Sequence, residues 1–335
     1  MSKAPTLEDV AAAAGVSTAT VSRCLNTPDK VVAQTRRRVL AAVEALGYAP
    51  NFSARALVAK RTQTIGAVIP TMENAVFAEG IQAFQDVLQA QRFMLLIASS
   101  GYDPKAEADA VRTLVARGAD GVLLIGFDRD DNVYEFLASQ RIPAVVAWAY
   151  KDGGPLPSVG FDNAAAMERL VSHAIGLGHA RVGLISGIQA GNDRARARVT
   201  GAQAALGAAG IEAATVVETS YGFAQGGSAL DRLLDRDPDL TLVVCGNDVL
   251  AAGAVRRARA LGLSVPADLS ITGFDDIGLA ELVDPPLTTV RVPHRAMGQA
   301  AAERLLALVT GQSAHSLRLD AQLCLRESLA KVRGK

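Results

Sequence analysis

Eight short apolar runs, separated by stretches with helical spacing, constrain this chain more than any other feature. The runs are IGAVIP (65–70), FMLLIA (93–98), GVLLIG (121–126), PAVVAW (143–148), RVGLIS (181–186), ATVVET (214–219), LTLVVCG (240–246) and LSITGF (269–274). Apolar strands that alternate with helices indicate parallel sheets covered by helices on both faces. Four runs followed by four more predict an α/β body of two similar lobes, each with a parallel, doubly wound sheet.

The charge of the chain is unevenly distributed along the sequence. The formal net charge is zero, yet residues 1–61 carry nine Lys and Arg side chains against four acids, giving +5 and leaving −5 on the remainder. A basic head on an acidic body indicates a head that binds a polyanion, with a solvated basic surface as the alternative. Because 335 residues exceed what one hydrophobic core usually organises, we expect separate domains.

The basic head begins with start and stop signals for two short helices. Thr6 opens the run TLED and can cap the first helix, and Gly15 can end that helix in the left-handed conformation. Ser17 is the cap of a second helix over 18–25. Two short helices joined by a tight glycine corner predict a helix-turn-helix.

A third helix completes the predicted all-α head. We expect it to run from a Thr35 cap to Leu46, with Gly47 as its stop. The apolar positions that should face the other two helices are Val39, Val43 and Leu46.

The second helix has small side chains on its outward face. Val21 and Leu25 are four residues apart and should face the bundle. The side chains left outward are Thr18, Ala19, Ser22 and Arg23. Small residues allow a helix to approach the floor of the DNA major groove, where hydroxyls and an arginine reach phosphates and base edges. The alternative is a helical hairpin used for contacts with proteins.

The run TLEDVAAAAGVSTATVSRCLN, followed by VVAQTRRRVLAAVEALGYAPN, resembles the DNA-binding head of the lactose-repressor (LacI/GalR) family of bacterial transcription regulators. Together with the two-lobed pattern, the resemblance covers essentially the whole chain. It implies that Thr18, Ala19 and Arg23 hold the base-reading positions. Ala19 departs from the polar side chains often found there, so selectivity should depend on Arg23, Thr18 and the hinge.

The resemblance also implies a hinge helix that orders on DNA, at NFSARALVA (51–59). Leu57 would be the apolar wedge inserted into the minor groove, where unstacking a base step kinks the duplex. The alternative for Leu57 is an ordinary linker residue. The full DNA-binding set implied is Thr6, Ser17, Thr18, Ala19, Thr20, Ser22, Arg23, Asn26, Asn51, Ala54, Arg55 and Leu57.

Polar side chains follow three of the predicted strands of the body. Asn247 and Asp248 follow the seventh run, Asp275 and Asp276 follow the eighth, and the stretch 192–198 supplies further amide, carboxylate and arginine groups. Ligands of open parallel sheets bind beyond the carboxyl ends of the strands, and in a two-lobed protein that site lies between the lobes. Carboxylate, amide and guanidinium groups together suit a polyol. The alternative is that Asn247 and Asp275 cap the helices that follow.

By resemblance to the family, six positions are implied to contact an effector: Phe77, Trp148, Arg194, Arg198, Asn247 and Asp275. Trp148 departs from the aspartate that sugar repressors often carry there. The run AGNDRARARVTG resembles the gluconate-repressor-like branch of the family, which makes a sugar acid the first effector hypothesis, a neutral sugar the second and a purine-type corepressor the third. Because Arg194, Arg196 and Arg198 alternate, they cannot all face the cleft of a helix-borne site.

Enzymatic and metal-dependent functions find no support in the sequence. The chain has no G-x-x-x-x-G-K-[ST], H-E-x-x-H or G-x-S-x-G motif, so we expect no catalytic residues, no metal and no cofactor. The three cysteines are far apart and read as small buried or half-buried thiols. The N-terminus lacks an apolar h-region and no run approaches membrane-helix length, so a cytoplasmic location is expected.

These observations predict a sequence-specific DNA-binding transcriptional regulator, of the repressor type, controlled by a sugar acid or sugar bound between two lobes. The alternative is a solute-binding protein without a DNA role. We expect a homodimer on a pseudo-palindromic operator. The predicted parts are a helix-turn-helix head (1–49), a hinge and linker (50–61) and a body (62–335). Within the body, the family resemblance implies an N-lobe of about 62–160 and 293–320 and a C-lobe of about 161–291 and 321–335, joined by three crossings.

Overall fold

The computed structural model describes residues 4–49, 61–73 and 75–332. They fall into two compact units, one ending at Thr62 and the other beginning at Gln63. The predicted hinge contacts Asn51, Ala54, Arg55 and Leu57 lie outside the described residues, as does the side chain of Asn26.

The first unit is the helical head, with α1 (Leu7–Ala14), α2 (Thr18–Asn26), the short 3-10 turn η1 (Pro28–Lys30) and α3 (Ala33–Leu46). The predicted signals at the helix-turn-helix are confirmed: Thr6 forms a capping box with Asp9, Gly15 is left-handed at φ 61°, and the Ser17 side chain accepts from Thr20 N. The buried core consists of Val10, Ala11, Ala14, Val21, Cys24, Val39 and Ala42.

Two details of the predicted third helix are wrong. The helix begins at Ala33, because its first hydrogen bond runs from Arg36 N to the carbonyl of Val32, upstream of the Thr35 cap that we expected. Leu46 is exposed, and Ala42 takes the inward position instead. Ala42 and Leu46 lie on the same face as Val39, so the contact with the other helices ends before the last turn. The stop at Gly47 is confirmed.

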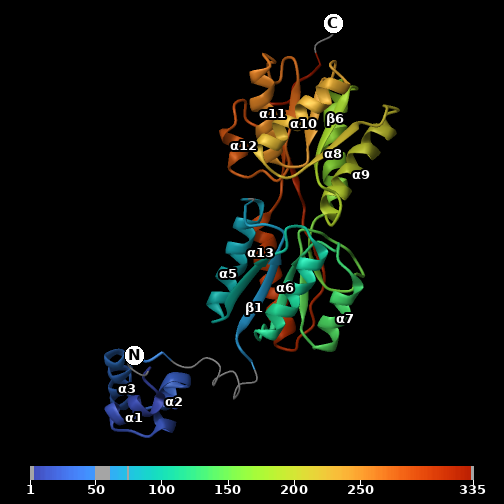
Figure 1. The fold of residues 1–335 in the computed structure, drawn as a ribbon. Helices are drawn as coiled ribbons and strands as arrows, with labels where there is room; N and C mark the ends of the chain where they lie inside the picture. Colours follow the sequence, from blue (N-terminus) through green and yellow to red (C-terminus); the bar gives the residue numbers. More distant parts are fainter. Residues whose placement is uncertain (1–3, 50–60, 74, 333–335) are drawn as a thin grey trace. The chain divides into compact units, whose positions relative to one another are not determined.

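The N-lobe of the second unit has a parallel sheet in the order β11-β5-β4-β3-β1-β2. Its strands are β1 (Thr64–Ile69), β2 (Met94–Ser99), β3 (Gly121–Ile125), β4 (Ala144–Ala147), β5 (Ser158–Gly160) and β11 (Leu317–Arg318). Its helices are the short η2 (Ala75–Phe77), α5 (Ala78–Ala90), α6 (Pro104–Ala116), α7 (Asp131–Ser139) and α13 (His294–Val309). The apolar face of α5 and α13 covers one side of the sheet and that of α6 and α7 the other (Figure 1).

The C-lobe repeats this plan with a parallel sheet in the order β7-β6-β8-β9. Its strands are β6 (Val182–Gly187), β7 (Thr215–Thr219), β8 (Leu242–Cys245) and β9 (Ser270–Thr272). Its helices are α8 (Asn163–Gly176), α9 (Asp193–Ala208), α10 (Phe223–Arg236), α11 (Asp248–Ala260) and α12 (Leu279–Leu282). One core lies under α8 and α9, and another under α10 and α11.

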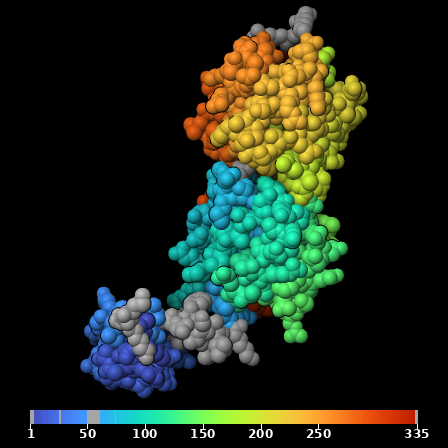
Figure 2. Space-filling view, in the orientation of Figure 1, coloured from blue at the N-terminus to red at the C-terminus, as the bar shows by residue number. Residues whose placement is uncertain are grey.

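Strands that run between the lobes tie them together. β10 (Thr289–Arg291) pairs antiparallel with β12 (Gln322–Cys324), after β11 has joined the N-lobe sheet beside β5. Figure 2 shows the surfaces of the two lobes meeting, and one contact is the Phe127 amide of the N-lobe, which donates to Asp193 of the C-lobe over 2.7 Å. The carboxyl ends of both sheets therefore face a common interface.

The predicted fold class is confirmed, with each of the eight apolar runs containing a strand. Two of those strands are less buried than expected, because β2 and β7 are edge strands whose outward residues meet solvent. The sequence did not predict β5, β10, β11 and β12, because strands of two or three residues are too short to produce an apolar pattern.

Candidate functional site

The exposed face of α2 is the candidate nucleic-acid interface of the head. Val21 and Cys24 are buried in the bundle, whereas Thr18, Ala19 and Arg23 are exposed. No residue of this outward face is larger than a threonine until Arg23, so the helix can approach a surface closely at its N-terminal end. The first turn of a recognition helix is also the part that reaches base edges in helix-turn-helix proteins.

The other predicted residues of the head have mixed surroundings. The Thr6 hydroxyl donates to the Asp9 carboxylate over 2.8 Å, and the Ser17 and Thr20 hydroxyls lie 2.9 Å apart, so local hydrogen bonds already hold these side chains. Ser22 is half-buried. The sequence did not point to Arg38, whose guanidinium donates to the Ala14 and Gly15 carbonyls (the latter at 3.2 Å) and fixes the corner before α2.

Arg198 is the centre of the polar cluster in the body. Its side chain is only 9 % exposed, and its guanidinium donates to Asn163 Oδ1 at 2.9 Å, to the Gly246 carbonyl at 2.6 Å and to Asp275 Oδ1 at 3.2 Å. It also lies over the Phe274 ring, 3.8 Å from the centroid. Four groups thus hold one guanidinium at the carboxyl ends of the C-lobe strands.

Asn247 and Asp275 adjoin this arginine. The side-chain Oδ1 of Asn247 accepts from Leu250 N at 2.9 Å and caps α11, as in the alternative explanation. The buried Nδ2 of the same side chain has no hydrogen-bond partner among the described residues. Asp275 does not cap a helix, because α12 begins four residues later, after Gly278. Burial raises the pKa of the Asp275 carboxyl, and Arg198 opposes that rise. These contacts leave an amide donor in the cluster that a ligand oxygen could accept from.

The alternating arginines of α9 face different ways. Arg194 is buried and pairs with Asp193 at 2.7 Å, and it can lie against the N-lobe backbone because Gly126 has no side chain: a Cβ there would fall 1.8 Å from the guanidinium. Arg196 is 44 % exposed and pairs with Asp128 at 2.6 Å. Arg194 and Arg198, four residues apart, are therefore the buried arginines of α9, with Arg194 against the N-lobe backbone and Arg198 bonded within the C-lobe.

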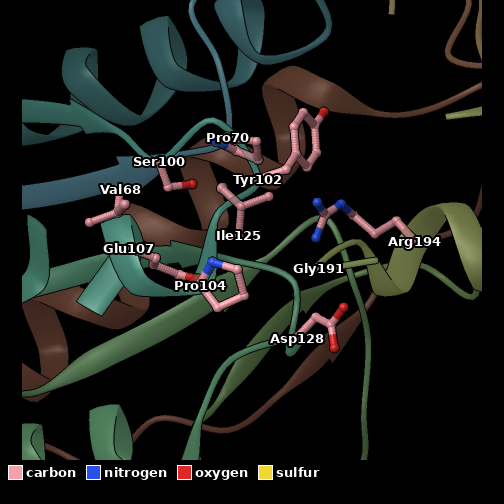
Figure 3. Close-up of a pocket in the computed structure, with 10 residues that line it drawn as sticks. All are labelled: Val68, Pro70, Ser100, Tyr102, Pro104, Glu107, Ile125, Asp128, Gly191 and Arg194. Atoms are coloured by element: carbon pink, nitrogen blue, oxygen red, sulfur yellow. The ribbon is translucent and has the colours of Figure 1, made fainter. Parts of the chain in front are cut away.

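A small cavity of about 10 Å³ lies between the lobes, which is about the space of one water molecule. Its walls come from strand ends of the N-lobe and from the start of α9, and Figure 3 shows the Arg194 guanidinium pointing toward Tyr102 and Ile125. The lining residues are Val68, Pro70, Ser100, Tyr102, Pro104, Glu107, Ile125, Asp128, Gly191 and Arg194.

Tyr102 and Tyr221 are site residues that the sequence analysis missed. Their rings lie 5.8 Å apart, and the Tyr221 hydroxyl accepts from Asn192 Nδ2 at 3.1 Å. Burial, and then the neighbouring Tyr221, raise the pKa of Tyr102 far above its usual range, so its hydroxyl stays protonated and can donate. Both tyrosines follow predicted strands, so the strand-end rule that selected Asn247 could also have found them.

Glu107, which lines the cavity from the N-lobe, belongs to a further ionic pair. Glu107 accepts from Arg129, whose guanidinium lies 2.9 Å away, and both side chains are largely shielded from solvent. Burial raises the pKa of the Glu107 carboxyl, and Arg129 opposes that rise.

In the C-lobe, burial raises the pKa of Asp248 to about 8, although the carboxyl accepts from Thr289 Oγ1 at 2.6 Å and from Ile277 N at 2.9 Å.

Phe77 and Trp148 form an aromatic cluster of their own. Their rings meet edge to face with centroids 5.3 Å apart, and both side chains are buried. Gly80 of α5 leaves room for the indole, because a Cβ at this position would come within 2.6 Å of the ring. Neither residue is among those lining the described cavity, and the indole Nε1 donates to His294 Nδ1 at 3.3 Å. Their contact with an effector stays a prediction.

Comparisons with known proteins give one consistent result. Residues 6–51 match the model for bacterial regulatory proteins of the lacI family, and residues 62–328 match the model for periplasmic binding proteins and the sugar binding domain of the LacI family. The chain is 37 % identical to the HTH-type transcriptional regulator MalR of Streptomyces coelicolor over 98 % of both chains. It is 34 % identical to the HTH-type transcriptional regulator GntR of Pseudomonas aeruginosa over 97 % of this chain and 95 % of that one.

Solved structures agree with the sequence matches. A LacI family regulator from Silicibacter pomeroyi superposes with a TM-score of 0.89 at 27 % identity, covering 97 % of this chain and 99 % of that one. The lac repressor dimer bound to operator and the anti-inducer ONPF superposes with a TM-score of 0.86 at 29 % identity, covering 98 % of this chain and 100 % of that one. No described helix is long and apolar enough to cross a membrane.

Proposed function

Because the chain belongs to the lacI family of bacterial regulatory proteins and is a DNA-binding transcriptional regulator, we propose that its signal is an uncharged polyhydroxylated compound, a sugar, bound between the lobes. One observation carries this choice of effector: the arginines around the cleft are already paired with carboxylates. The alternative of a solute-binding protein without a DNA role is set aside, since the head itself matches the regulatory family.

The charge balance of the cleft argues against an anionic effector. Arg194 pairs with Asp193 at 2.7 Å, Arg198 with Asp275 at 3.2 Å, and Arg129 with Glu107 at 2.9 Å. Among the described residues of the cleft, these arginines are already paired, so no cation is free to neutralise the carboxylate of an anionic effector. Asp275 would also repel that carboxylate. A neutral sugar thus moves ahead of the sugar acid that the sequence favoured.

The same groups suit hydroxyls. A sugar hydroxyl can donate to the second oxygen of Asp275 and accept from the unpartnered Asn247 Nδ2. The tyrosine pair Tyr102 and Tyr221 supplies apolar ring faces and two further hydroxyls. Arg194 and Arg198 would then be shared between their carboxylate partners and the ligand. Phe77 and Trp148 would support the cluster from behind.

For the head, we propose that Arg23 and Thr18 contact base edges, that Ala19 makes apolar contact with a thymine methyl, and that the remaining predicted polar residues position the helix on phosphates. Exposure of Thr18, Ala19 and Arg23 on α2 supports this assignment. We further propose that Leu57 is the minor-groove wedge. The protein would act as a homodimeric repressor on a pseudo-palindromic operator in the cytoplasm and would catalyse no reaction.

We also propose the division of the body at 160–162, 291–293 and 320–323. Three connections support this division: β5 to α8, β10 to α13 and β11 to β12. Each connection leads from one lobe toward the other lobe, or toward the β10–β12 pair between the lobes. Motion of the lobes about these segments would change the spacing of the paired heads.

The effector proposal is tested by thermal unfolding of the full chain with panels of neutral sugars, sugar acids and purines. A ligand that binds only the native state raises the midpoint as its concentration exceeds Kd. We expect at least one neutral sugar to raise it in the wild type and in Arg196→Met, whose arginine is exposed, but not in Arg198→Met. A response limited to sugar acids or purines would overturn the charge-balance argument.

The DNA proposal is tested with an operator obtained by selection from random duplexes. Arg23→Ala should lose about 1–3 kcal/mol of operator binding at fixed salt, because a bidentate arginine–guanine contact contributes that much discrimination. Arg37→Ala, another exposed arginine of the head, is the control and should weaken operator and scrambled DNA equally. Unchanged selectivity in Arg23→Ala would contradict the assignment.

A further inference from the structure

Five buried residues form a closed ring of hydrogen bonds between the two lobes: Trp148, Asn163, Arg198, Asp275 and His294. Asn163 Nδ2 donates to the Trp148 carbonyl at 3.1 Å, and Asn163 Oδ1 accepts from Arg198 Nε at 2.9 Å. Arg198 donates to Asp275 Oδ1 at 3.2 Å, and the Asp275 carbonyl lies 3.3 Å from His294 Nε2. The Trp148 indole N–H, which donates to His294 Nδ1 at 3.3 Å, closes the ring.

The ring fixes the state of His294. An indole nitrogen can only donate, so Nδ1 of His294 must be unprotonated, and the proton of the neutral imidazole is then on Nε2, where it donates to the Asp275 carbonyl. Burial lowers the pKa of His294, which agrees with a neutral ring. One imidazole therefore joins an N-lobe donor to a C-lobe acceptor.

The ring crosses the interface twice. Trp148 follows β4 and His294 begins α13, so both belong to the N-lobe, whereas Asn163, Arg198 and Asp275 belong to the C-lobe. The two crossing bonds are Asn163 to Trp148 and His294 to Asp275. Asn163 and His294 are also the first residues of the helices that follow two of the chain passages between the lobes.

Two members of the ring have backbone conformations that side chains rarely adopt. Trp148 has φ 63° and Asp275 has φ 104°. Such conformations persist only where surrounding contacts over-determine them, and they cluster at functional sites. Trp148 is the N-lobe end of the bond with Asn163, and Asp275 is the C-lobe end of the bond with His294. The Trp148 amide also donates to Met297 Sδ at 3.1 Å.

We propose that Asn163 and His294 are positioning residues that tie the effector-binding pair Arg198 and Asp275 of the C-lobe to Trp148 of the N-lobe, so that engagement of that pair is transmitted across the interface. The proposal rests on the proposed function for the identity of the effector pair. In this account Trp148 reports and transmits the state of the cleft instead of contacting the ligand. A closed ring of hydrogen bonds has discrete intact and broken states, which is what a coupling element requires.

Trp148 is the only tryptophan of the chain, which gives the proposal a direct readout. Full-length protein with isotopically labelled tryptophan should show one indole N–H resonance, and its hydrogen exchange reports the bond to His294. In His294→Phe, which keeps a ring but no acceptor, we expect exchange roughly tenfold faster, the factor that corresponds to one ordinary hydrogen bond. His294→Gln offers both an acceptor and a donor and should restore much of the protection.

The matched control is His179→Phe. His179 is another buried histidine, bonded to Thr241 and to the Ala330 carbonyl, and it lies outside the ring. General loosening of the body would affect the indole in both histidine variants, whereas loss of the ring affects it only in His294→Phe. Equal effects in the two variants, or an unchanged indole in His294→Phe, would overturn the ring.

Transmission is tested by Asn163→Asp. At neutral pH this side chain still accepts from Arg198 but no longer donates to the Trp148 carbonyl. A neutral sugar from the thermal screen should shift the indole resonance of the wild type and of His179→Phe on binding. It should still stabilise Asn163→Asp, but with most of the indole shift lost; a full shift in that variant would refute transmission. If no sugar stabilises the protein, the effector class is wrong, and the exchange measurements alone decide the ring.

Discussion

Replacing Arg198 by methionine removes one member of a buried ion pair and leaves the other behind. The side chains of Arg198 and Asp275 are 9 % and 2 % exposed, and their charged atoms are 3.2 Å apart. Removing one partner of a buried pair costs about 3–5 kcal/mol, mainly because the remaining charge is uncompensated. Methionine keeps apolar contact with the Phe274 ring, so the loss should come from polar groups and not from a cavity.

A matched variant lies two residues away on the same helix. Arg196 also pairs with an aspartate, Asp128, at 2.6 Å, but its side chain is 44 % exposed. Exposed pairs contribute about 0–1 kcal/mol, so Arg196→Met should change the free energy of unfolding by less than that. Both variants delete one arginine from α9, which cancels effects of net charge and helix propensity.

The assay is urea unfolding of the full chain, followed by far-ultraviolet circular dichroism and by the emission of Trp148, with equal m-values as the condition for comparing midpoints. The loss in Arg198→Met should also depend on pH. Burial already raises the pKa of Asp275, and Arg198 opposes that rise, so removing the arginine raises this pKa further. A carboxyl whose folded pKa is raised favours folding at low pH, so the loss relative to the wild type should grow as pH rises through the already raised folded pKa of Asp275 in the wild type.

The reasoning is refuted if Arg198→Met loses no more stability than Arg196→Met. It is also refuted if the loss in Arg198→Met shrinks as pH rises. The double variant Arg198→Met with Asp275→Leu should recover much of the single-variant loss, since replacing both partners of a buried pair by apolar groups is often neutral.

Three further predictions test local features. Ser17→Ala removes the cap of the recognition helix and should cost about 1 kcal/mol in thermal unfolding of the head, while Ser17→Asn, which retains a capping oxygen, should cost little. Burial raises the pKa of Asp248 to about 8, so its protonated form favours folding, and this contribution should be lost as pH rises from about 5 toward that value; Asp248→Asn should abolish that component in urea titrations. Gly201→Ala places a Cβ 2.1 Å from the Ala164 carbonyl and should cost about 1–3 kcal/mol, whereas Gly207→Ala on the same helix meets nothing within 4 Å and should not destabilise.

Local chemistry explains where the sequence predicted well. The caps at Thr6 and Ser17 and the left-handed Gly15 are decided within three or four residues, so the helix-turn-helix could be placed before the structure was known. The start of the third helix was wrong because Thr35 is a good cap in isolation, yet the chain turns earlier, after η1.

The polar cluster around Arg198 was predictable only in part. Asn247 and Asp275 were found because they follow strands, and Arg198 entered through the family resemblance. Their partners Asn163 and Phe274, and the pairing of Arg129 with Glu107, have no comparable signal. Arg198 and Asp275 are separated by 77 positions, so the sheet order must be known before their pairing can be.

By itself, the sequence determined the alternation of strands and helices, the basic head with its capped helices and the polar residues at the strand ends, because short-range periodicity and turn chemistry specify each of them. Only the tertiary structure decided the charge balance of the cleft and the ring through Trp148 and His294. The ring bonds Trp148 to His294 across 146 positions, and such contacts exist because two separate chain passages bring the lobes face to face. No local pattern encodes which distant groups will neutralise one another there, and that neutralisation is what changes the expected effector from an anion to a neutral sugar.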